Sequence, residues 1–275
     1  MPIVNINGID LNYEISGQGP AVFLLHGGNG RAQDWANQFP ILSPNYTAIA
    51  LDIRGHGKSA APKTEAEYSI PLIAEDVLGL LDRLGIAKCC LVGHSFGGFV
   101  ALHFAVTHQE RLAGLILVDT ASGPYGGGNT KTGELTQKLV GIAVSQGMDA
   151  VFEYDAAHNP ERIEKFMHHP ELIEPARQTM LAMSVNAYIW GSQTVAKWPP
   201  VTPRLGEIRV PTLIFRGEED LRFATAVKTL EQGIHGSILT TIKNTGHSPH
   251  QDSPKIFNRE LVKFLARAWP SAKTG

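Results

Sequence analysis

The stretch 88-KCCLVGHSFGGFVALHFAVTH-108 decides the fold. Its first six residues form the kind of apolar run that a buried parallel strand needs, and the residues from Phe96 onward have the apolar pattern of a buried helix. Between them stands 93-GHSFG-97, and a G-x-S-x-G pattern between a strand and a helix is typical of a nucleophile elbow. Such a turn leaves no room for side chains two residues on either side of Ser95, and both of those residues are glycines. An incidental serine in a Gly-rich turn explains this context less well.

Alternating strand and helix patterns surround this stretch. Apolar runs at 21–27, 47–52, 112–119, 212–217 and 237–242 predict strands, and 71–85, 224–233 and 254–268 have helical patterns. The alternation favours βαβ units in an open parallel sheet. The opening residues 3–13 alternate around Asn7-Gly8, which predicts a hairpin of two antiparallel edge strands.

The pattern changes after residue 120. The Gly-rich stretch 121-ASGPYGGGNTKTG-133 leads out of the predicted sheet, and the chain from there to Pro199 has helical patterns without a strand. We therefore expect a core formed by residues 1–120 and 207–275, and a helical cap, or lid, formed by residues 121–206 over the C-terminal edge of the sheet.

The amino-acid composition limits the kinds of binding partner that we expect. The chain has 275 residues and a formal net charge of -2, with no basic tract, so neither nucleic acid nor a membrane is an expected partner. Cys89 and Cys90 are adjacent on a predicted strand, point to opposite faces and are unsuited to a disulfide. With no leader-like pattern near Met1, a cytoplasmic location is the expectation. A homodimer is left open.

A serine nucleophile needs a base that takes its proton and an acid that orients the base. His247 follows the last predicted strand, in 244-NTGHSP-249, and Asp220 ends the stretch 217-GEED-220. Both loops are expected at the C-terminal edge of the sheet, where Ser95 also emerges, and the order Ser, Asp, His is that of this elbow's usual triad.

Other residues compete for these roles. Asp119 ends the predicted strand 112–119 and therefore reaches the same edge, so it remains a rival acid, whereas Glu218 and Glu219 have longer side chains that suit the loop less well. The chain has 11 histidines, and His247 is favoured by its position. We interpret His94 as a residue held in the elbow that points elsewhere.

Acyl transfer also needs amides that bind an oxyanion. We expect the N–H of Phe96, next to the nucleophile, and that of Gly28 in 26-HGGNG-30, with Asn29 as the runner-up. Asn29 and Trp190 are candidate pocket residues, and Phe96 is a further one. The sequence has no HExxH, no CxxC and no complete P-loop or G-x-G-x-x-G, so neither a metal nor a cofactor is expected.

Together, 25-LHGG-28, 52-DIRGHGKS-59, 93-GHSFGG-98, 217-GEED-220 and 245-TGHSP-249 resemble the α/β-hydrolase superfamily with a helical cap. The layout is most similar to the 3-oxoadipate enol-lactonase, carboxylesterase and carbon-carbon bond hydrolase branches. The resemblance implies the α/β-hydrolase fold, a mostly parallel eight-stranded sheet flanked by helices with an inserted helical cap, and a triad of Ser95, His247 and Asp220. Haloalkane dehalogenases and cap-bearing epoxide hydrolases are also similar, but they have Asp at the position of Ser95.

The leading hypothesis is a serine hydrolase that cleaves a small apolar carboxylic ester or lactone through an acyl-enzyme intermediate. The alternative is a carbon-carbon bond hydrolase of a vinylogous diketone, which uses the same triad and needs cationic lid groups, for which Arg162 and Arg177 are candidates. A hypothesis from another class is a ligand-binding receptor that retains the fold.

Overall fold

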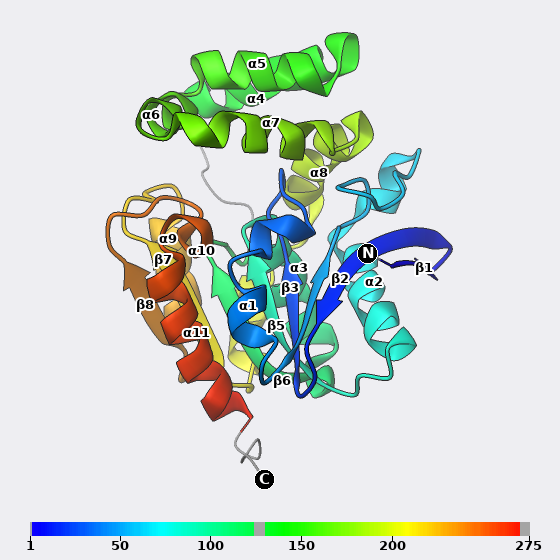
Figure 1. The fold of residues 1–275 in the computed structure, drawn as a ribbon, viewed down its shortest axis with the longest axis vertical. Coiled ribbons are helices and arrows are strands. Elements are labelled where there is room, and N and C mark those ends of the chain that lie inside the picture. The colour runs from blue at the N-terminus through cyan, green and yellow to red at the C-terminus, as the bar shows by residue number, and fades with distance from the viewer. Residues whose placement is uncertain (1, 124–129, 270–275) are drawn as a thin grey trace.

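The computed structural model describes residues 2–123 and 130–269, and its centre is the expected eight-stranded sheet (Figure 1). The strand order is β1-β2-β4-β3-β5-β6-β7-β8, and the six strands from β4 to β8 in that order are parallel. The strands are β1 (Ile3–Ile6), β2 (Ile9–Ser16), β3 (Ala21–Leu25), β4 (Thr47–Leu51), β5 (Cys89–His94), β6 (Leu112–Val118), β7 (Thr212–Gly217) and β8 (Ile238–Ile242). The predicted strand positions are confirmed to within a few residues.

The predicted hairpin forms, but only its first strand lies at the edge of the sheet. Ile9 to Asn12 of β2 pair with β1, and Tyr13 to Ser16 continue as the antiparallel neighbour of β4. The expectation of two edge strands was therefore wrong. The reason is that β2 is long enough to pair with two different strands in succession.

Helices cover both faces of the sheet. Successive residues of β3 point to opposite faces, so Phe23 packs in one apolar cluster and Leu24 in the other. Helices α2 (Ile70–Arg83), α3 (Phe96–Thr107) and α9 (Ala224–Gly233) supply the first cluster, and α1 (Phe39–Leu42) and α11 (Pro254–Ala268) supply the second. Cys89 and Cys90 are buried, unbridged and divided between the two clusters, as expected from their adjacent positions on β5.

Among the described residues between β6 and β7 are five α-helices, which we call the inserted helices: α4 (Thr130–Gln146), α5 (Met148–His158), α6 (Pro160–His168), α7 (Ile173–Leu181) and α8 (Val185–Lys197). They lie beyond the ends of the strands (Figure 1). Most of a third apolar cluster comes from them, including Val151, Phe152 and Met180, and Tyr68 from outside the inserted helices completes it. Of the Gly-rich stretch 121–133, residues 124–129 lie outside the described part of the chain.

The inserted helices are joined to the rest of the molecule mainly through α8. The hydroxyl of Thr194 donates to the carbonyl of Tyr68 at 2.6 Å, and the N–H of Ser184 donates to the carbonyl of Gly55 at 2.8 Å. On another side, Lys165 of α6 forms an ion pair with Asp252 of α10 (Pro249–Asp252) at 3.1 Å. The short 3-10 helices are η1 (Ala32–Trp35), η2 (Glu65–Tyr68), η3 (Gln109–Arg111), η4 (Pro170–Leu172) and η5 (Thr202–Glu207).

Candidate active site

The elbow after β5 has the backbone that the glycine pattern predicts. Ser95 has φ 48° and ψ -110°, a conformation that costs energy for a residue with a side chain. A Cβ on Gly93 would lie 2.4 Å from the carbonyl oxygen of Gly97, and one on Gly97 would lie 2.5 Å from that of Leu25. Glycine is therefore required at both positions, because any larger residue would push the turn apart.

Hydrogen bonds from β6 and the segment after it hold Ser95 in this conformation. The N–H of Ser95 donates to the carbonyl of Val118 at 2.9 Å, and the hydroxyl of Thr120 donates to the carbonyl of Ser95 at 2.8 Å. Both backbone groups of the strained residue are thus used for anchoring, and its hydroxyl is left for other partners.

The structure brings Ser95, His247 and Asp220 together in one hydrogen-bonded line. The Nε2 of His247 lies 2.9 Å from the Oγ of Ser95, and its Nδ1 lies 2.5 Å from Oδ2 of Asp220. Because a carboxylate accepts, Nδ1 carries the proton and Nε2 presents a lone pair to the serine hydroxyl. The sequence placed these residues in three separate loops, and the parallel strands β5, β7 and β8 deliver those loops to the same edge of the sheet.

The environment of Asp220 favours its ionised form. Its side chain is buried, the whole residue being 6% exposed, and burial raises the pKa of a carboxyl group. The hydrogen bond and charge interaction with His247, together with the N–H of Phe223 at 3.3 Å, outweigh this and leave the pKa of Asp220 below its ordinary value. Asp220 therefore stays charged and can stabilise a protonated His247.

The rival acid, Asp119, has a different environment. It is fully buried, and both of its carboxyl oxygens accept from the N–H of Gly217, at 3.0 and 3.2 Å. Burial and the nearby charge of Asp220 raise the pKa of Asp119 to about 9. A carboxyl group that is protonated at neutral pH is a poor partner for an imidazolium, and the acid that contacts His247 is Asp220.

Two contacts of His247 were not expected from the sequence. The ring of Phe223 stacks on it, with centroids 4.9 Å apart and an interplanar angle of 20°. Its backbone carbonyl lies 2.7 Å from Nε2 of His94. The interpretation that His94 points elsewhere was therefore wrong, because its ring reaches the loop of the base. The position of Phe223, three residues after Asp220, was the available signal for that residue.

The loop after β3 lies beside Ser95. A Cβ built on Gly27 would be 3.4 Å from that of Ser95, and one on Gly28 would be 3.7 Å from that of Phe96. Within residues 2–123 and 130–269, neither the N–H of Gly28 nor that of Phe96 has a hydrogen-bond acceptor. Two free amides on adjacent backbone segments are what an oxyanion site needs.

Buried histidines fix this loop. The carbonyl of Gly27 accepts from Nδ1 of His26 at 2.7 Å and from the N–H of Gly30 at 3.0 Å. This orients the peptide plane to which the N–H of Gly28 belongs. The carbonyl of Gly28 lies 2.8 Å from Nε2 of His56, which orients the N–H of Asn29 in the same way. Burial, and next the neighbouring His56, lower the pKa of His26 to about 3, so this ring stays neutral.

The three candidate pocket residues lie on three different elements. Asn29 is exposed on the loop after β3. Trp190 is half-buried on α8, where its ring contacts that of Tyr68 with centroids 5.4 Å apart. Both remain predictions as pocket residues. Phe96, buried at the start of α3, lies directly beside Ser95.

The two arginines of the inserted helices are engaged in ion pairs. Arg162 contacts Asp155 at 2.9 Å, and Arg177 contacts Asp149 at 2.7 Å and Glu153 at 3.7 Å. Their charges are therefore already balanced within the inserted helices. Binding a substrate carboxylate would require these pairs to be broken or shared.

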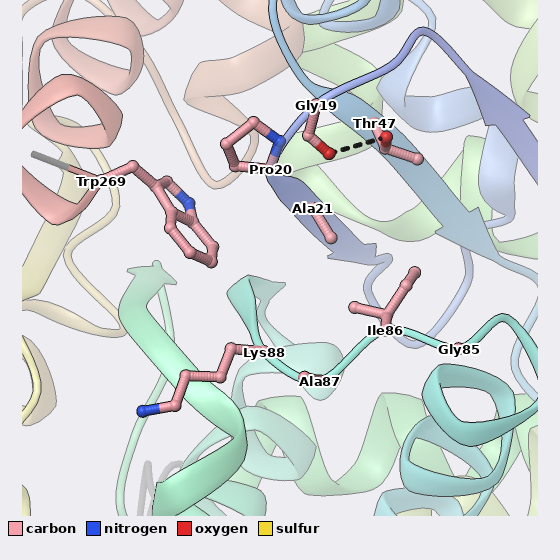
Figure 2. A pocket seen from close by; sticks show the side chains of 9 residues that line it. All are labelled: Gly19, Pro20, Ala21, Thr47, Gly85, Ile86, Ala87, Lys88 and Trp269. Atoms are coloured by element: carbon pink, nitrogen blue, oxygen red, sulfur yellow. Dashed lines mark hydrogen bonds between the residues drawn. The ribbon is translucent and has the colours of Figure 1, made fainter. Parts of the chain in front are cut away.

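A cavity of about 430 Å³ lies away from this site (Figure 2). Its walls include Ala21, Thr47 and Lys88, which stand at or just before the first residues of β3, β4 and β5, together with Trp269. Ser95 follows the last residue of β5, so the cavity and the triad lie at opposite ends of the sheet. Among the described residues, no three His, Cys, Asp or Glu side chains are grouped as a metal site requires. No helix in the described ranges is both long and apolar enough to cross a membrane.

Comparison with known proteins gives a consistent picture. Residues 20–254 match the family model described as alpha/beta hydrolase fold. A Bacillus subtilis protein provisionally named 2-succinyl-6-hydroxy-2,4-cyclohexadiene-1-carboxylate synthase is 29% identical over 96% of this chain and 99% of its own. The 2-hydroxy-6-oxo-6-phenylhexa-2,4-dienoate hydrolase of Comamonas testosteroni is 30% identical over 93% of this chain and 91% of its own.

Two solved structures are also similar. The enol-lactonase from Burkholderia xenovorans LB400 has a TM-score of 0.84 and 26% identity, covering 96% of this chain and 100% of its own. A thermophilic esterase from Thermogutta terrifontis has a TM-score of 0.85 and 28% identity, covering 98% of this chain and 99% of its own. The names of these similar proteins describe different reactions.

Proposed function

This chain belongs to the α/β-hydrolase fold family, and we propose that it is a serine hydrolase that cleaves a small apolar carboxylic ester or lactone. The observation that carries the proposal is the line of hydrogen bonds from Oγ of Ser95 through His247 to Asp220, at 2.9 and 2.5 Å. These distances suit proton transfer from a nucleophile to a base that is held in one tautomer.

In the acylation step, Oγ of Ser95 attacks the ester carbonyl carbon while its proton passes to Nε2 of His247. The imidazolium that forms is stabilised by the charged Asp220. The carbonyl oxygen becomes an oxyanion, which the N–H groups of Gly28 and Phe96 bind. When the intermediate collapses, the C–O bond breaks and the leaving alkoxide takes the proton from His247, so an alcohol departs and an acyl-Ser95 ester remains.

Deacylation repeats these steps with water. His247 removes a proton from a water molecule, whose oxygen attacks the acyl carbon, and the same amides bind the second oxyanion. Collapse returns the proton to Oγ of Ser95 and releases a carboxylic acid. With a lactone, the alcohol and the acid stay on one molecule, so the product is a hydroxy acid. The triad and the two amides thus serve both half-reactions.

A carbon-carbon bond hydrolase is the second candidate, because the Comamonas testosteroni relative at 30% identity has a name of that kind. Such a substrate carries a carboxylate that needs a cation. Arg162 and Arg177, the candidates for that role, are balanced by acidic side chains of the inserted helices. We therefore favour the ester or lactone, whose carbonyl requires only the two amides.

The test is a panel of p-nitrophenyl esters of increasing acyl length, simple lactones and one vinylogous diketone acid, assayed with the wild type and Ser95→Ala. We expect ester or lactone turnover by the wild type, and a loss of at least about 10⁴-fold on substitution. Ser145→Ala is the matched control, because that hydroxyl bonds only within α4 and should be dispensable.

Each other outcome contradicts the proposal in a distinct way. Turnover of the diketone acid alone would favour the carbon-carbon hydrolase. Tight binding of an ester without turnover would favour a ligand-binding receptor. Ester hydrolysis that survives in Ser95→Ala would remove Ser95 from the chemistry.

A further inference from the structure

His94 takes no part in the proposed acyl-transfer steps, although it lies next to Ser95. It is 7% exposed, directly precedes Ser95 and ends β5. Its Nε2 lies 2.7 Å from the backbone carbonyl oxygen of His247. Because a carbonyl only accepts, Nε2 must carry the proton and donate. One short side chain therefore joins the residue before the nucleophile to the backbone of the base.

The rest of the His94 ring is enclosed by groups of the same site. A Cβ on Gly27 would lie 2.8 Å from Nδ1, so the ring lies directly against the loop that carries the N–H of Gly28. Its other neighbours are the rings of His250 and His247, with centroids at 4.6 and 5.0 Å. The ring thus contacts both the loop after β3, which carries Gly27, and the loop that carries His247.

The ring also has one defined protonation state. Burial, followed by the nearby His250 and His247, lowers the pKa of His94 well below its usual range. The neutral ring has one proton, which the hydrogen bond to His247 assigns to Nε2. His94 therefore offers the carbonyl a permanent donor over the range of pH in which a serine hydrolase works.

We propose that His94 is a positioning residue for the general base, and that its hydrogen bond keeps Nε2 of His247 within reach of Ser95. This inference rests on the proposed function. The contacts with Asp220 and Phe223 fix the rotation of the His247 ring. Both residues belong to the segment after β7, so these contacts position the ring relative to that segment only. The hydrogen bond from His94 positions the backbone of His247 relative to β5, the strand that precedes Ser95.

The size of the effect follows from the geometry. Losing the bond would let the His247 loop shift relative to Ser95, and a misplacement of about 1 Å lowers a rate by roughly 100-fold. The loss should appear in kcat, because His94 is only 7% exposed and contacts the backbone of His247. KM should change little.

The decisive experiment compares His94→Gln, His94→Asn and His94→Ala. The amide nitrogen of glutamine reaches as far along the side chain as Nε2 of histidine, whereas that of asparagine reaches only as far as Nδ1. We expect Asn and Ala to lower kcat by roughly 30-fold to 100-fold and Gln to recover most of that loss. Rates are expressed per active site, titrated with a fluorophosphonate, so that a smaller folded fraction does not count as slower chemistry.

Two further readouts separate positioning from packing. The rate at which the fluorophosphonate labels Ser95 reports the nucleophile without any choice of substrate, and it should follow the order wild type, Gln, Asn. Because Nδ1 of His247 lies 2.5 Å from Asp220, we expect a strongly deshielded Nδ1 proton in the proton NMR spectrum of the wild type, and we expect it to persist in Gln and to exchange faster in Asn. Gln is one methylene larger than Asn, so a residue that only fills space could also change the rate between them, but it would leave this proton equally protected in both variants.

Failure of this inference is distinguishable from failure of the proposed function. A wild type that neither labels at Ser95 nor hydrolyses any ester would overturn the proposed function. A wild type that does both, with Asn and Gln equal to each other, or with the loss confined to KM, would overturn the role of His94. If His94→Ala does not fold, the Gln and Asn pair decides the question alone.

Discussion

The edge of the sheet and the inserted helices differ in how tightly they constrain a side chain. Ser95, Asp220 and His247 each follow a strand in register with its parallel neighbour, and hydrogen bonds between their loops lock the result. The inserted helices pack around an apolar cluster that they share with Tyr68 of η2, and they are tied to the rest mainly by α8. The geometry of the candidate triad therefore depends on the sheet and its loops, and depends little on the inserted helices.

The two regions also differ in the environment of their charged side chains. At the sheet edge, one buried acid is kept ionised by its histidine partner while a second, Asp119, is raised to a pKa of about 9. In the inserted helices, Arg177 is paired with acids on the surface. Substitutions at the sheet edge should thus act on chemistry, and those in the inserted helices on selectivity or on nothing.

The largest effect that tests this contrast is expected from Asp220→Asn. The amide presents the wrong group to Nδ1 of His247 and removes the charge that stabilises the imidazolium, so kcat should fall by about 10³-fold to 10⁴-fold. Asp119→Asn is the matched control, because an amide resembles a protonated carboxyl group and its oxygen can still accept from Gly217. Kinetics with a p-nitrophenyl ester measure both. Equal losses in the two variants would mean that the acids share the role.

The second effect is a loss of stability at acidic pH, and it tests whether the fold at the sheet edge requires a neutral His250. His250 is 1% exposed, packs against the rings of Trp35 and His94, and has no hydrogen-bond partner for its ring nitrogens within the described residues. Burial, and next His247, lower the pKa of His250 to about 3. The unfolded chain takes up a proton below about pH 6.5 and the folded chain does not, so stability falls as pH falls through that range.

His250→Phe should remove this contribution. Between pH 6 and pH 5, the free energy of unfolding of the wild type should fall by up to about 1.4 kcal/mol more than that of the variant, as measured by urea denaturation. The difference between the two proteins isolates His250 from the other groups that titrate in acid. Parallel curves for the two proteins would show that the ring takes up a proton in the folded state over the same range of pH as in the unfolded chain.

Sequence reasoning succeeded where the chain leaves few choices. The elbow at Ser95 was predictable because two glycines are required at fixed spacing, and the places of Asp220 and His247 followed from parallel strands that end at one edge. The contact of His94 was missed because its partner is the backbone carbonyl of a residue 153 positions away, which no spacing reveals. The contact of Trp190 with Tyr68 was equally hidden, because the helical phase of α8 depends on packing.

A third, smaller effect is expected from Trp190→Ala. If the indole lines the substrate pocket as predicted, its removal should change the ratio of kcat/KM for long-acyl to short-acyl esters by about 10-fold, corresponding to roughly 1.4 kcal/mol of lost apolar contact. Trp190→Phe keeps the contact with Tyr68 and serves as the control for packing. An unchanged ratio, together with a lower melting temperature, would place Trp190 in the interior of the inserted helices alone.

The smallest effect is expected from Arg177→Gln. The side chain forms a partly exposed ion pair with Asp149, where solvent screens the charges, so ester kcat/KM should stay within about 2-fold of the wild type. Arg162→Gln, at the more buried pair with Asp155, should perturb α5 and α6 more while still sparing the ester reaction. A carbon-carbon hydrolase would behave in the opposite way, since loss of a carboxylate-binding cation would raise KM for an anionic substrate and leave neutral esters unaffected. Measuring both substrate classes with both variants therefore decides whether either arginine leaves its acidic partner to bind substrate.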